Sequence, residues 1–277
     1  MNNIATKAQD LTIAIHVLQS TGQIPAFYRL PKKQRELEKA FMKELQKALD
    51  GLGSVLLSKV HMQDRLASPE NLFGYFEADV WRRATSIEEA YQTHLGLGME
   101  FGYLRGGKEV SELVGVTLDF NLKNPAVQQI LRERTFVASE ATMSRMLGDV
   151  ETILRRGYER GLGGDKIANL LDMKFHEMKR QRLEMISRTE IGSAQNEGAM
   201  KSYEDAEITH VQWLAAHDER TRYSHLLEHG KKVRRGEKFP VTQLRYPGDK
   251  QGDISEWVNC RCAVRAVVNT PKERKVR

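Results

Sequence analysis

The sequence predicts an α+β protein, with a mostly helical N-terminal half and a small C-terminal α+β module that contains a short antiparallel sheet. Apolar residues recur at helical spacing from residue 5 to residue 204. After Ile208 the pattern changes to glycine, proline and short alternating apolar runs, which are typical of strands and turns. Only 7 prolines occur in 277 residues, and Leu, Glu, Lys, Arg, Gln and Ala are abundant, which further favours helix.

The N-terminal region is expected to begin with two helices. The first covers residues 5–19, and the second starts at Pro31, because proline is well suited to the first helical position. One apolar face of this second helix is formed by Leu37, Phe41, Leu45 and Leu49. The apolar run at 55–60 fits a strand or a helix, since periodicity cannot decide over so few residues.

Residues 70–107 are predicted to be mostly helical. Ser86 and Glu89 have the spacing of a capping box, in which each side chain binds a backbone N–H at the start of a helix. Glycines interrupt this segment at Gly96, Gly98 and Gly102. Because glycine destabilises a helix, these positions predict close helix packing or a bend. The stretch 105–108 (Arg-Gly-Gly-Lys) is expected to form a loop.

The middle of the chain is expected to contain one strand and two helices. Residues 114–120 alternate in the manner of a short strand. Asn124 and Pro125 are typical of a helix start, and that helix is expected to end near Arg134. A second, long amphipathic helix is predicted over residues 139–160.

The glycine-rich stretch 161–164 is expected to end the long helix. Asp165 would cap a short helix, and a further helix would begin near Asp172. A joint is expected at 187–189, followed by a helix over residues 190–204.

The C-terminal part is expected to supply the sheet. Residues 211–215 and 260–268 alternate like strands, and 231–239 resembles a hairpin arm or a loop. The tail is highly charged and is expected to fray.

We therefore predict two regions. Residues 1–135 form a helical N-terminal region. Residues 136–277 form a second domain with long helices over 139–204, a small α+β module over 205–270 and a charged tail over 271–277.

Composition and charge narrow the class of protein. The chain is 40% hydrophobic and 29% charged, which is typical of a folded protein with a polar surface. A net charge of +6 favours a polyanionic partner such as nucleic acid, although 37 acidic residues are interspersed among 43 basic ones. The start of the chain does not resemble a signal peptide, and no apolar run suits a membrane span. We expect synthesis in the cytoplasm and no membrane partner.

The two cysteines are the strongest chemical signal. Cys260 and Cys262 are the only cysteines in the sequence, and their spacing would place both thiols on one face of a strand. His225 could join them as a third ligand of a zinc ion, the one cofactor that the sequence suggests. The alternative is a reduced cysteine pair packed in a small core, with His225 hydrogen-bonded nearby.

A hydrolytic site is a second alternative. Glu190 and Asp218 could hold Mg²⁺ while His225 acts as a general base, as in a metal-dependent nuclease or another DNA-processing enzyme. The structural alternative assigns these residues other tasks: Asp218 caps a turn, Arg220 pairs with Glu190, and His225 braces the loop.

Basic residues are densest shortly after the first predicted strand of the module. This cluster consists of Lys231, Lys232, Arg234, Arg235 and Lys238. If these side chains share a face, they would bind phosphates without regard to base sequence and with a strong dependence on salt. The alternative is an ordinary solvated loop.

A series of short motifs over residues 150–268 resembles the Mu F-like minor head proteins of tailed phages, known as head morphogenesis proteins. The motifs are Gly161-Leu162-Gly163-Gly164, Phe175, Arg182, Ser187-Arg188-Thr189-Glu190-Ile191-Gly192, Asn196, Gly198, Tyr203, Trp213, Asp218-Glu219-Arg220-Thr221-Arg222, His225, Gly230, Phe239, Pro247-Gly248-Asp249 and Asn259-Cys260-Arg261-Cys262. Each motif is weak alone, but their order and spacing are specific to that family. Residues 1–135 carry no motif that matches.

The resemblance implies a structural assembly factor rather than an enzyme. Such a minor capsid protein would bind the portal protein and the major capsid or scaffolding protein, and would lie in the capsid interior near the portal of the virion. It would also contact double-stranded phage DNA non-specifically. Arg188, Glu190, Asp218 and Arg220 would belong to the structural motif of the module. Some related chains join this module to a toxin or enzyme domain, which we do not expect here.

The sequence departs from the family pattern at one position of interest. Some family members carry C-x-x-C where this chain has Arg222 to His225, and Arg222 cannot be a metal ligand. His217 or Asp218 could then supply the fourth ligand of a zinc site.

Overall fold

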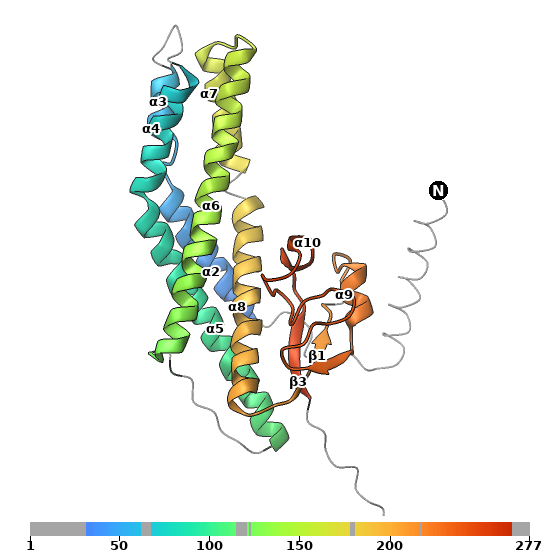
Figure 1. Ribbon diagram of the computed structural model, residues 1–277. Coiled ribbons are helices and arrows are strands. Elements are labelled where there is room, and N and C mark those ends of the chain that lie inside the picture. Colours follow the sequence, from blue (N-terminus) through green and yellow to red (C-terminus); the bar gives the residue numbers. More distant parts are fainter. Residues whose placement is uncertain are drawn as a thin grey trace, which may run out of the picture. The chain divides into compact units, whose positions relative to one another are not determined.

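A computed structural model describes residues 32–61, 68–114, 121, 123–177, 181–216 and 218–267. Helices dominate, and a three-stranded antiparallel sheet lies in the C-terminal region (Figure 1). The predicted α+β class is confirmed. Within these described residues, no helix has the length and apolar character that a membrane span requires.

The helices follow the order of the chain. They are α2 (Lys32–Leu49), α3 (Ser54–His61), α4 (Pro69–Arg82), α5 (Ala84–Val114), α6 (Pro125–Glu159), α7 (Gly164–Glu177), α8 (Leu183–Asp205), α9 (Tyr223–Glu228) and α10 (Ile254–Trp257). The strands are β1 (His210–Leu214), β2 (Lys232–Arg234) and β3 (Ala263–Val267).

The chain divides into two compact units, each built from separate stretches. Of the described residues, the sheet unit holds 32–37, 97–114, 188–216 and 218–267, and the helical unit holds the rest. The predicted boundary near residue 135 falls inside α6. The division into functional regions 1–135 and 136–277 stays a prediction.

The helical unit is a packed bundle. α3 packs against α4 and α7, and α6 packs against α4 and α7 (Figure 1). The ring of Phe41 meets Tyr91 edge-on at a centroid distance of 5.0 Å, and the Tyr91 hydroxyl lies 2.7 Å from that of Thr142. Phe76 and Phe175 add a second aromatic contact at 5.5 Å. The predicted apolar face of α2 is confirmed, because its four residues are buried.

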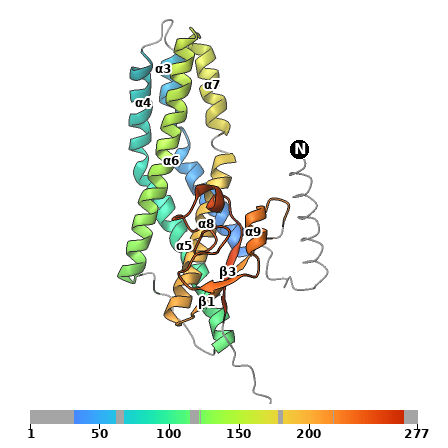
Figure 2. The ribbon, with the colours of Figure 1, turned by 45° about the vertical axis from the view of Figure 1, so that its right-hand side comes forward.

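The sheet unit is organised around β1, which lies between β2 and β3 and runs antiparallel to both. Alternate residues point to opposite faces of the sheet, so Val211 and Trp213 are buried on one side. The core beneath them includes Tyr203 from α8 and Val264 from β3. Figure 2 shows β1 and β3 beside the C-terminal part of α8.

Glycines bring α5 and α8 into close contact within the sheet unit. A Cβ atom on Gly102 would lie 2.0 Å from the backbone oxygen of Gln195, and one on Gly198 would lie 2.1 Å from that of Met99. Gly98 also faces Ala194. The predicted close helix packing is therefore confirmed at Gly98 and Gly102, where the small residue lets two backbones approach.

Two expectations for the helix after residue 84 are wrong. Ser86 is not a cap, because α5 already begins at Ala84. Residues 105–108 form no loop, since they continue α5. The reason is again packing: Gly106 faces Ser202 on α8, where a Cβ atom would lie only 2.2 Å from the hydroxyl oxygen.

The two helices predicted at 125–134 and 139–160 are one helix, α6. Its start is as predicted, with Asn124 accepting a hydrogen bond from the backbone N–H of Ala126 and Pro125 following the cap. No breaker separates the two predicted segments, and Thr135 and Ala138 extend the buried face across them. The strand predicted at 114–120 lies almost wholly outside the described residues, and Val114 ends α5.

The predicted helix start at Asp172 and the joint at 187–189 are also wrong. Asp172 lies inside α7, where it pairs with His176 at 3.8 Å. α8 passes through 187–189 without a break. The polar residues there are used within the helix: Ser187 donates to the carbonyl of Glu184, and Thr189 accepts a hydrogen bond from a distant loop.

The C-terminal strands lie at the predicted places. β1 is shifted by one residue, β3 is shorter than predicted, and β2 occupies part of the expected hairpin arm. Cys260 and Cys262 precede β3 rather than lying on it. The short helices α9 and α10 were not predicted. The helix at 5–19 and the tail at 271–277 lie outside the described residues.

We predict that Gly102→Ala lowers the free energy of unfolding by about 1–3 kcal/mol, because the added methyl group forces two helix backbones apart. The matched control is Gly148→Ala on α6, where nothing lies within 4 Å of the new Cβ atom. This control should stabilise the protein by up to about 1 kcal/mol. Urea denaturation of both variants makes the comparison, and equal effects would contradict the prediction.

Candidate functional site

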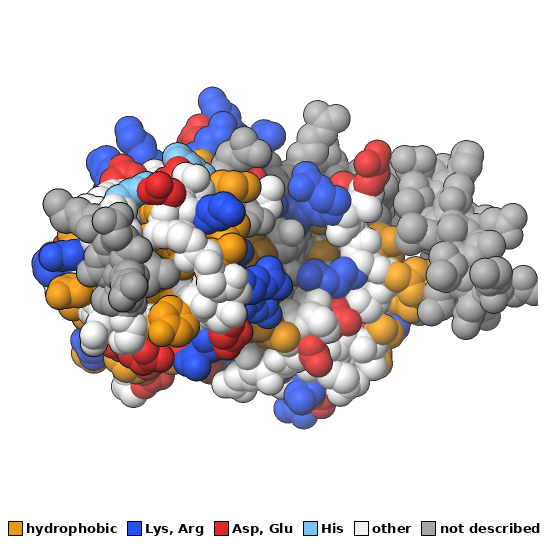
Figure 3. All heavy atoms as spheres, turned by 90° about the horizontal axis from the view of Figure 1, so that it is seen from above, with side chains coloured by type: hydrophobic (Ala, Val, Ile, Leu, Met, Phe, Trp, Pro, Cys, Tyr) orange, Lys and Arg blue, Asp and Glu red, His pale blue; other side chains and the backbone are white. Residues whose placement is uncertain are grey.

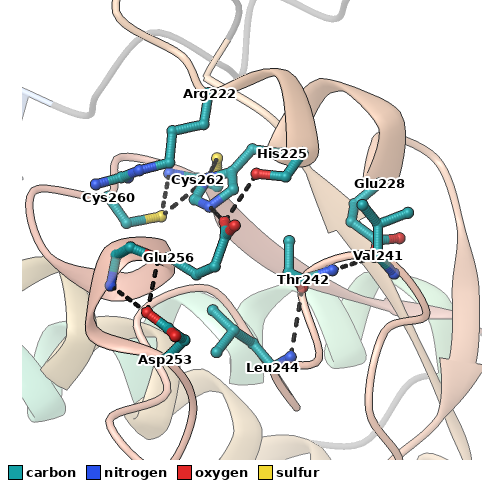
Figure 4. A network of polar contacts seen from close by, with 12 residues as sticks. Arg222, His225, Glu228, Val241, Thr242, Leu244, Asp253, Glu256, Cys260 and Cys262 are labelled. Atoms are coloured by element: carbon teal, nitrogen blue, oxygen red, sulfur yellow. Dashed lines mark hydrogen bonds and ion pairs between the residues drawn. The ribbon is translucent and has the colours of Figure 1, made fainter.

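His225 and the two cysteines converge in the sheet unit. The Nδ1 atom of His225 lies 3.3 Å from the sulfur of Cys262 and 3.6 Å from that of Cys260 (Figure 4). All three residues are buried, and their ligand atoms lie within 4.8 Å of one another. Both cysteines are free thiols. No other group of three or more His, Cys, Asp or Glu in the described part of the chain is close enough to share a metal ion.

Glu256, on α10, holds the far side of the imidazole. One carboxylate oxygen lies 3.0 Å from Nε2 of His225 and accepts a hydrogen bond of 2.8 Å from the hydroxyl of Ser224. A carboxylate at Nε2 favours the tautomer in which this nitrogen carries the proton. The lone pair of Nδ1 then points at the two sulfurs. Sequence reasoning missed Glu256, since it lies 31 residues from His225 in a short segment without a motif.

The two thiols have different acidities. A hydrogen bond from Cys262 lowers the pKa of Cys260, and His225 acts in the same direction against the effect of burial. Burial raises the pKa of Cys262, and the neighbouring Cys260 raises it further. The pKa values of the two cysteines are therefore shifted in opposite directions by their mutual contact.

Polar side chains of α8 position the cysteine loop, residues 259–262, which carries both cysteines. The hydroxyl of Thr189 accepts a 2.8 Å hydrogen bond from the backbone N–H of Asn259, and the guanidinium of Arg188 donates to the Asn259 side chain at 2.9 Å. Asn259 has a left-handed backbone with φ of 57°, a conformation that asparagine tolerates better than most residues. The predicted structural role of Arg188 thus has a specific contact.

Asn196, also on α8, connects three chain segments. Its amide nitrogen donates to the carbonyls of Pro247 and Cys262 at 2.9 and 3.0 Å, and its oxygen accepts from the backbone N–H of Val264 at 3.1 Å. The residue is buried, so these groups have no access to water. One side chain therefore ties α8 to the Pro247 loop and to the start of β3.

The Pro247-Gly248-Asp249 loop packs directly on α8. Gly248 has φ of 84°, and a Cβ atom there would lie 2.9 Å from the backbone of Ser193. Burial alone would raise the pKa of Asp249, but hydrogen bonds from Arg245 and the backbone of Gln251 outweigh it and lower the pKa. The carboxylate is thereby kept charged and serves as a structural anchor for the loop.

The candidate hydrolytic residues each have a partner of their own. Glu190 is bound by the ammonium group of Lys250 at 2.5 Å, so the expected pair between Glu190 and Arg220 is not formed. Asp218 pairs with Arg261. It also accepts hydrogen bonds within its own turn, from the backbone N–H of Arg220 and from the hydroxyl of Thr221. Neither carboxylate contacts His225. The turn role predicted for Asp218 is confirmed.

The fourth zinc ligand expected from the sequence is not found among these groups. Asp218 is engaged by Arg261 and does not belong to the cluster of ligand atoms. His217 lies outside the described residues. Arg222 donates to the carbonyl of Val258 at 2.6 Å and so helps to close the loop before the cysteines.

The basic cluster contains two kinds of residue. Lys231 pairs with the buried carboxylate of Glu228 at 3.5 Å, and Arg235 pairs with Glu204 at 3.6 Å. The other members, Lys232, Arg234 and Lys238, are exposed. Lys232 and Arg234 are two positions apart on β2, so they project from the same face of the sheet.

A comparison with protein families covers the stretch that contains α8, the Pro247 loop and both cysteines. The model described as Phage Mu protein F like protein matches residues 148–265. Over these residues, which are less than half of the chain, the protein is similar to the Mu F-like family. The match confirms the resemblance found in the sequence motifs and associates the chain with phage head morphogenesis.

A search of curated proteins finds a relative in Enterococcus faecalis named NAD(+)–arginine ADP-ribosyltransferase EFV. The identity is 28% over 198 residues, which is 69% of this chain and 40% of the relative. The matched region thus spans well under half of that protein. No solved structure matches the chain with significance.

We predict that Asn196→Asp destabilises the protein by about 3 kcal/mol or more at neutral pH, because a carboxylate oxygen would face two carbonyl oxygens. Acidification should reduce the loss, since a protonated carboxyl group can donate one of the missing hydrogen bonds. Thermal unfolding at several pH values measures both effects. Asn169→Asp, at an exposed position on α7, is the matched control and should change little. A loss that does not vary with pH would contradict this role of the Asn196 amide.

Proposed function

We propose that this protein is a minor head protein that acts by assembly rather than by turnover. The family match over residues 148–265 is the observation that carries the proposal. The protein would bind the portal and the major capsid or scaffolding protein during head assembly, and it would remain in the capsid interior near the portal. The N-terminal region 1–135 would make the portal or shell contacts.

The contacts around the candidate site support an assembly role. Glu190, Asp218 and Asp249 are each engaged by a basic side chain, so their charges serve to hold loops in place. The polar residues of α8 likewise bind backbone groups of the loops before β3. Such an arrangement produces a rigid module suited to binding a partner.

The proposed DNA contact rests on the exposed part of the basic cluster. Lys232 and Arg234 have no ion pair among the described residues, and they share one face of an edge strand. Elsewhere the charges are mixed: Figure 3 shows basic and acidic side chains interspersed over one face of the molecule. Attraction of phosphates would therefore be local to β2 and would weaken with salt.

The assembly role predicts that the chain enters procapsids when it is produced together with the portal and major capsid proteins of its phage. Sedimentation of the particles, followed by mass spectrometry, measures its copy number. Omission of the portal protein is the control and should reduce incorporation. Particles that assemble normally and contain none of the chain would refute the proposal.

The DNA contact predicts that Lys232→Glu with Arg234→Glu weakens binding to duplex DNA. The slope of log affinity against log salt should shrink by about 2, one unit for each lost phosphate contact. Lys39→Glu with Lys43→Glu on α2 changes the charge equally at two exposed positions and is the matched control. If both double variants bind DNA alike, β2 is not the contact.

Transfer of ADP-ribose to arginine is a second candidate function, favoured by the name of the curated relative. Incubation of the purified chain with labelled NAD and an arginine-rich acceptor tests it. The nuclease alternative with Glu190, Asp218 and His225 has weaker support, since the two carboxylates are paired with Lys250 and Arg261. Incubation with duplex DNA and Mg²⁺ or Mn²⁺, beside Glu190→Gln, tests that alternative.

A further inference from the structure

The buried cluster of His225, Cys260 and Cys262 has the geometry of a metal site. In a tetrahedral zinc site with bonds of about 2.0 Å to nitrogen and about 2.3 Å to sulfur, neighbouring nitrogen and sulfur ligands lie about 3.5 Å apart. The two distances from Nδ1 of His225 to the sulfurs, 3.3 and 3.6 Å, fall on either side of that value. Both nitrogen–sulfur distances therefore fit one coordination tetrahedron, and all three ligand atoms lie within 4.8 Å of one another.

The surroundings of the cluster also suit a metal. Histidine ligands almost always donate their second ring N–H to a carboxylate, a backbone carbonyl or water, which fixes the ring and makes the ligating nitrogen more basic. Glu256 supplies that carboxylate at Nε2 of His225. The backbone N–H of Cys262 lies 3.5 Å from the sulfur of Cys260, a contact that favours a thiolate over a thiol.

The chemistry of the ligands selects the ion. Two thiolates and one imidazole form a soft set that prefers zinc over hard cations such as Mg²⁺ or Ca²⁺. In a reducing cytoplasm the thiols remain available, because disulfides rarely persist there.

We propose that the chain binds one zinc ion through Nδ1 of His225 and the sulfurs of Cys260 and Cys262, with Glu256 as a positioning residue. Among the described residues, no fourth His, Cys, Asp or Glu belongs to this cluster of ligand atoms. The ion joins α9, which carries His225, to the segment that leads into β3, and Glu256 extends the link to α10 (Figure 4). Its role is to stabilise the sheet unit, which has only three short strands.

The first experiment uses the full chain, produced in zinc-supplemented medium and purified without chelators. Elemental analysis should find close to one zinc per chain, and a strong chelator should lower the melting temperature. Replacement by Co²⁺ should give the thiolate-to-cobalt charge-transfer band and the visible bands of a tetrahedral site. A wild-type chain that holds no zinc, takes up no cobalt and keeps its melting temperature in chelator would overturn the proposal.

Variants then test the assignment of ligands. Cys260→Ser, Cys262→Ser and His225→Gln should each lose the metal, whereas His210→Gln on β1 should retain it. Glu256→Gln should keep the stoichiometry but weaken zinc affinity about 10- to 100-fold, as measured by competition with a chromophoric chelator. Full zinc content in His225→Gln, or unchanged affinity in Glu256→Gln, would refute the assigned role of that residue. If a ligand variant fails to fold, the cobalt spectrum of the wild-type chain still decides the question.

Discussion

The sheet unit depends on the buried side chain of Asn196. Its carboxamide uses both donor hydrogens and its oxygen on backbone groups of the Pro247 loop, of Cys262 and of Val264. A three-stranded sheet leaves many backbone groups of the adjoining loops without partners, and each unmet group costs free energy when buried. Side chains of α8 form hydrogen bonds with these backbone groups, and Asn196 alone binds three of them.

The same principle extends along α8. Thr189 and Arg188 hold Asn259, and the hydroxyl of Ser193 donates to the carbonyl of Gly248. α8 has few apolar positions, yet it is almost fully buried between residues 187 and 199. This is possible because its polar side chains form hydrogen bonds with groups of the loops that pack on it. On its other side, α8 meets α5 through glycines, where packing depends on the absence of side chains. The cysteines and His225 are brought together as a result of this scaffold.

Local patterns in the sequence predicted elements well where apolar periodicity or capping dominates, as in α2 and at the start of α6. They failed where tertiary contacts override local preference. Arg105-Gly106-Gly107-Lys108 has the composition of a loop, yet it is helical because Gly106 must pass close to Ser202. The polar residues at 187–189 resemble a joint, yet they continue α8 because loops far along the chain use them. Neither contact has a local signal, since each partner is distant in the sequence.

By itself, the sequence determined the α+β class, the family module over most of the C-terminal half, and the identity of His225, Cys260 and Cys262 as candidate ligands. Composition, periodicity and the order of short motifs are properties of the chain alone and do not depend on how it packs. Only the tertiary structure decided that the three side chains meet, that Glu256 fixes the imidazole, and that Glu190 and Asp218 are neutralised by Lys250 and Arg261. These outcomes depend on which loops α8 and β1 hold together, because a contact between residues separated by 30 to 60 positions is set by packing.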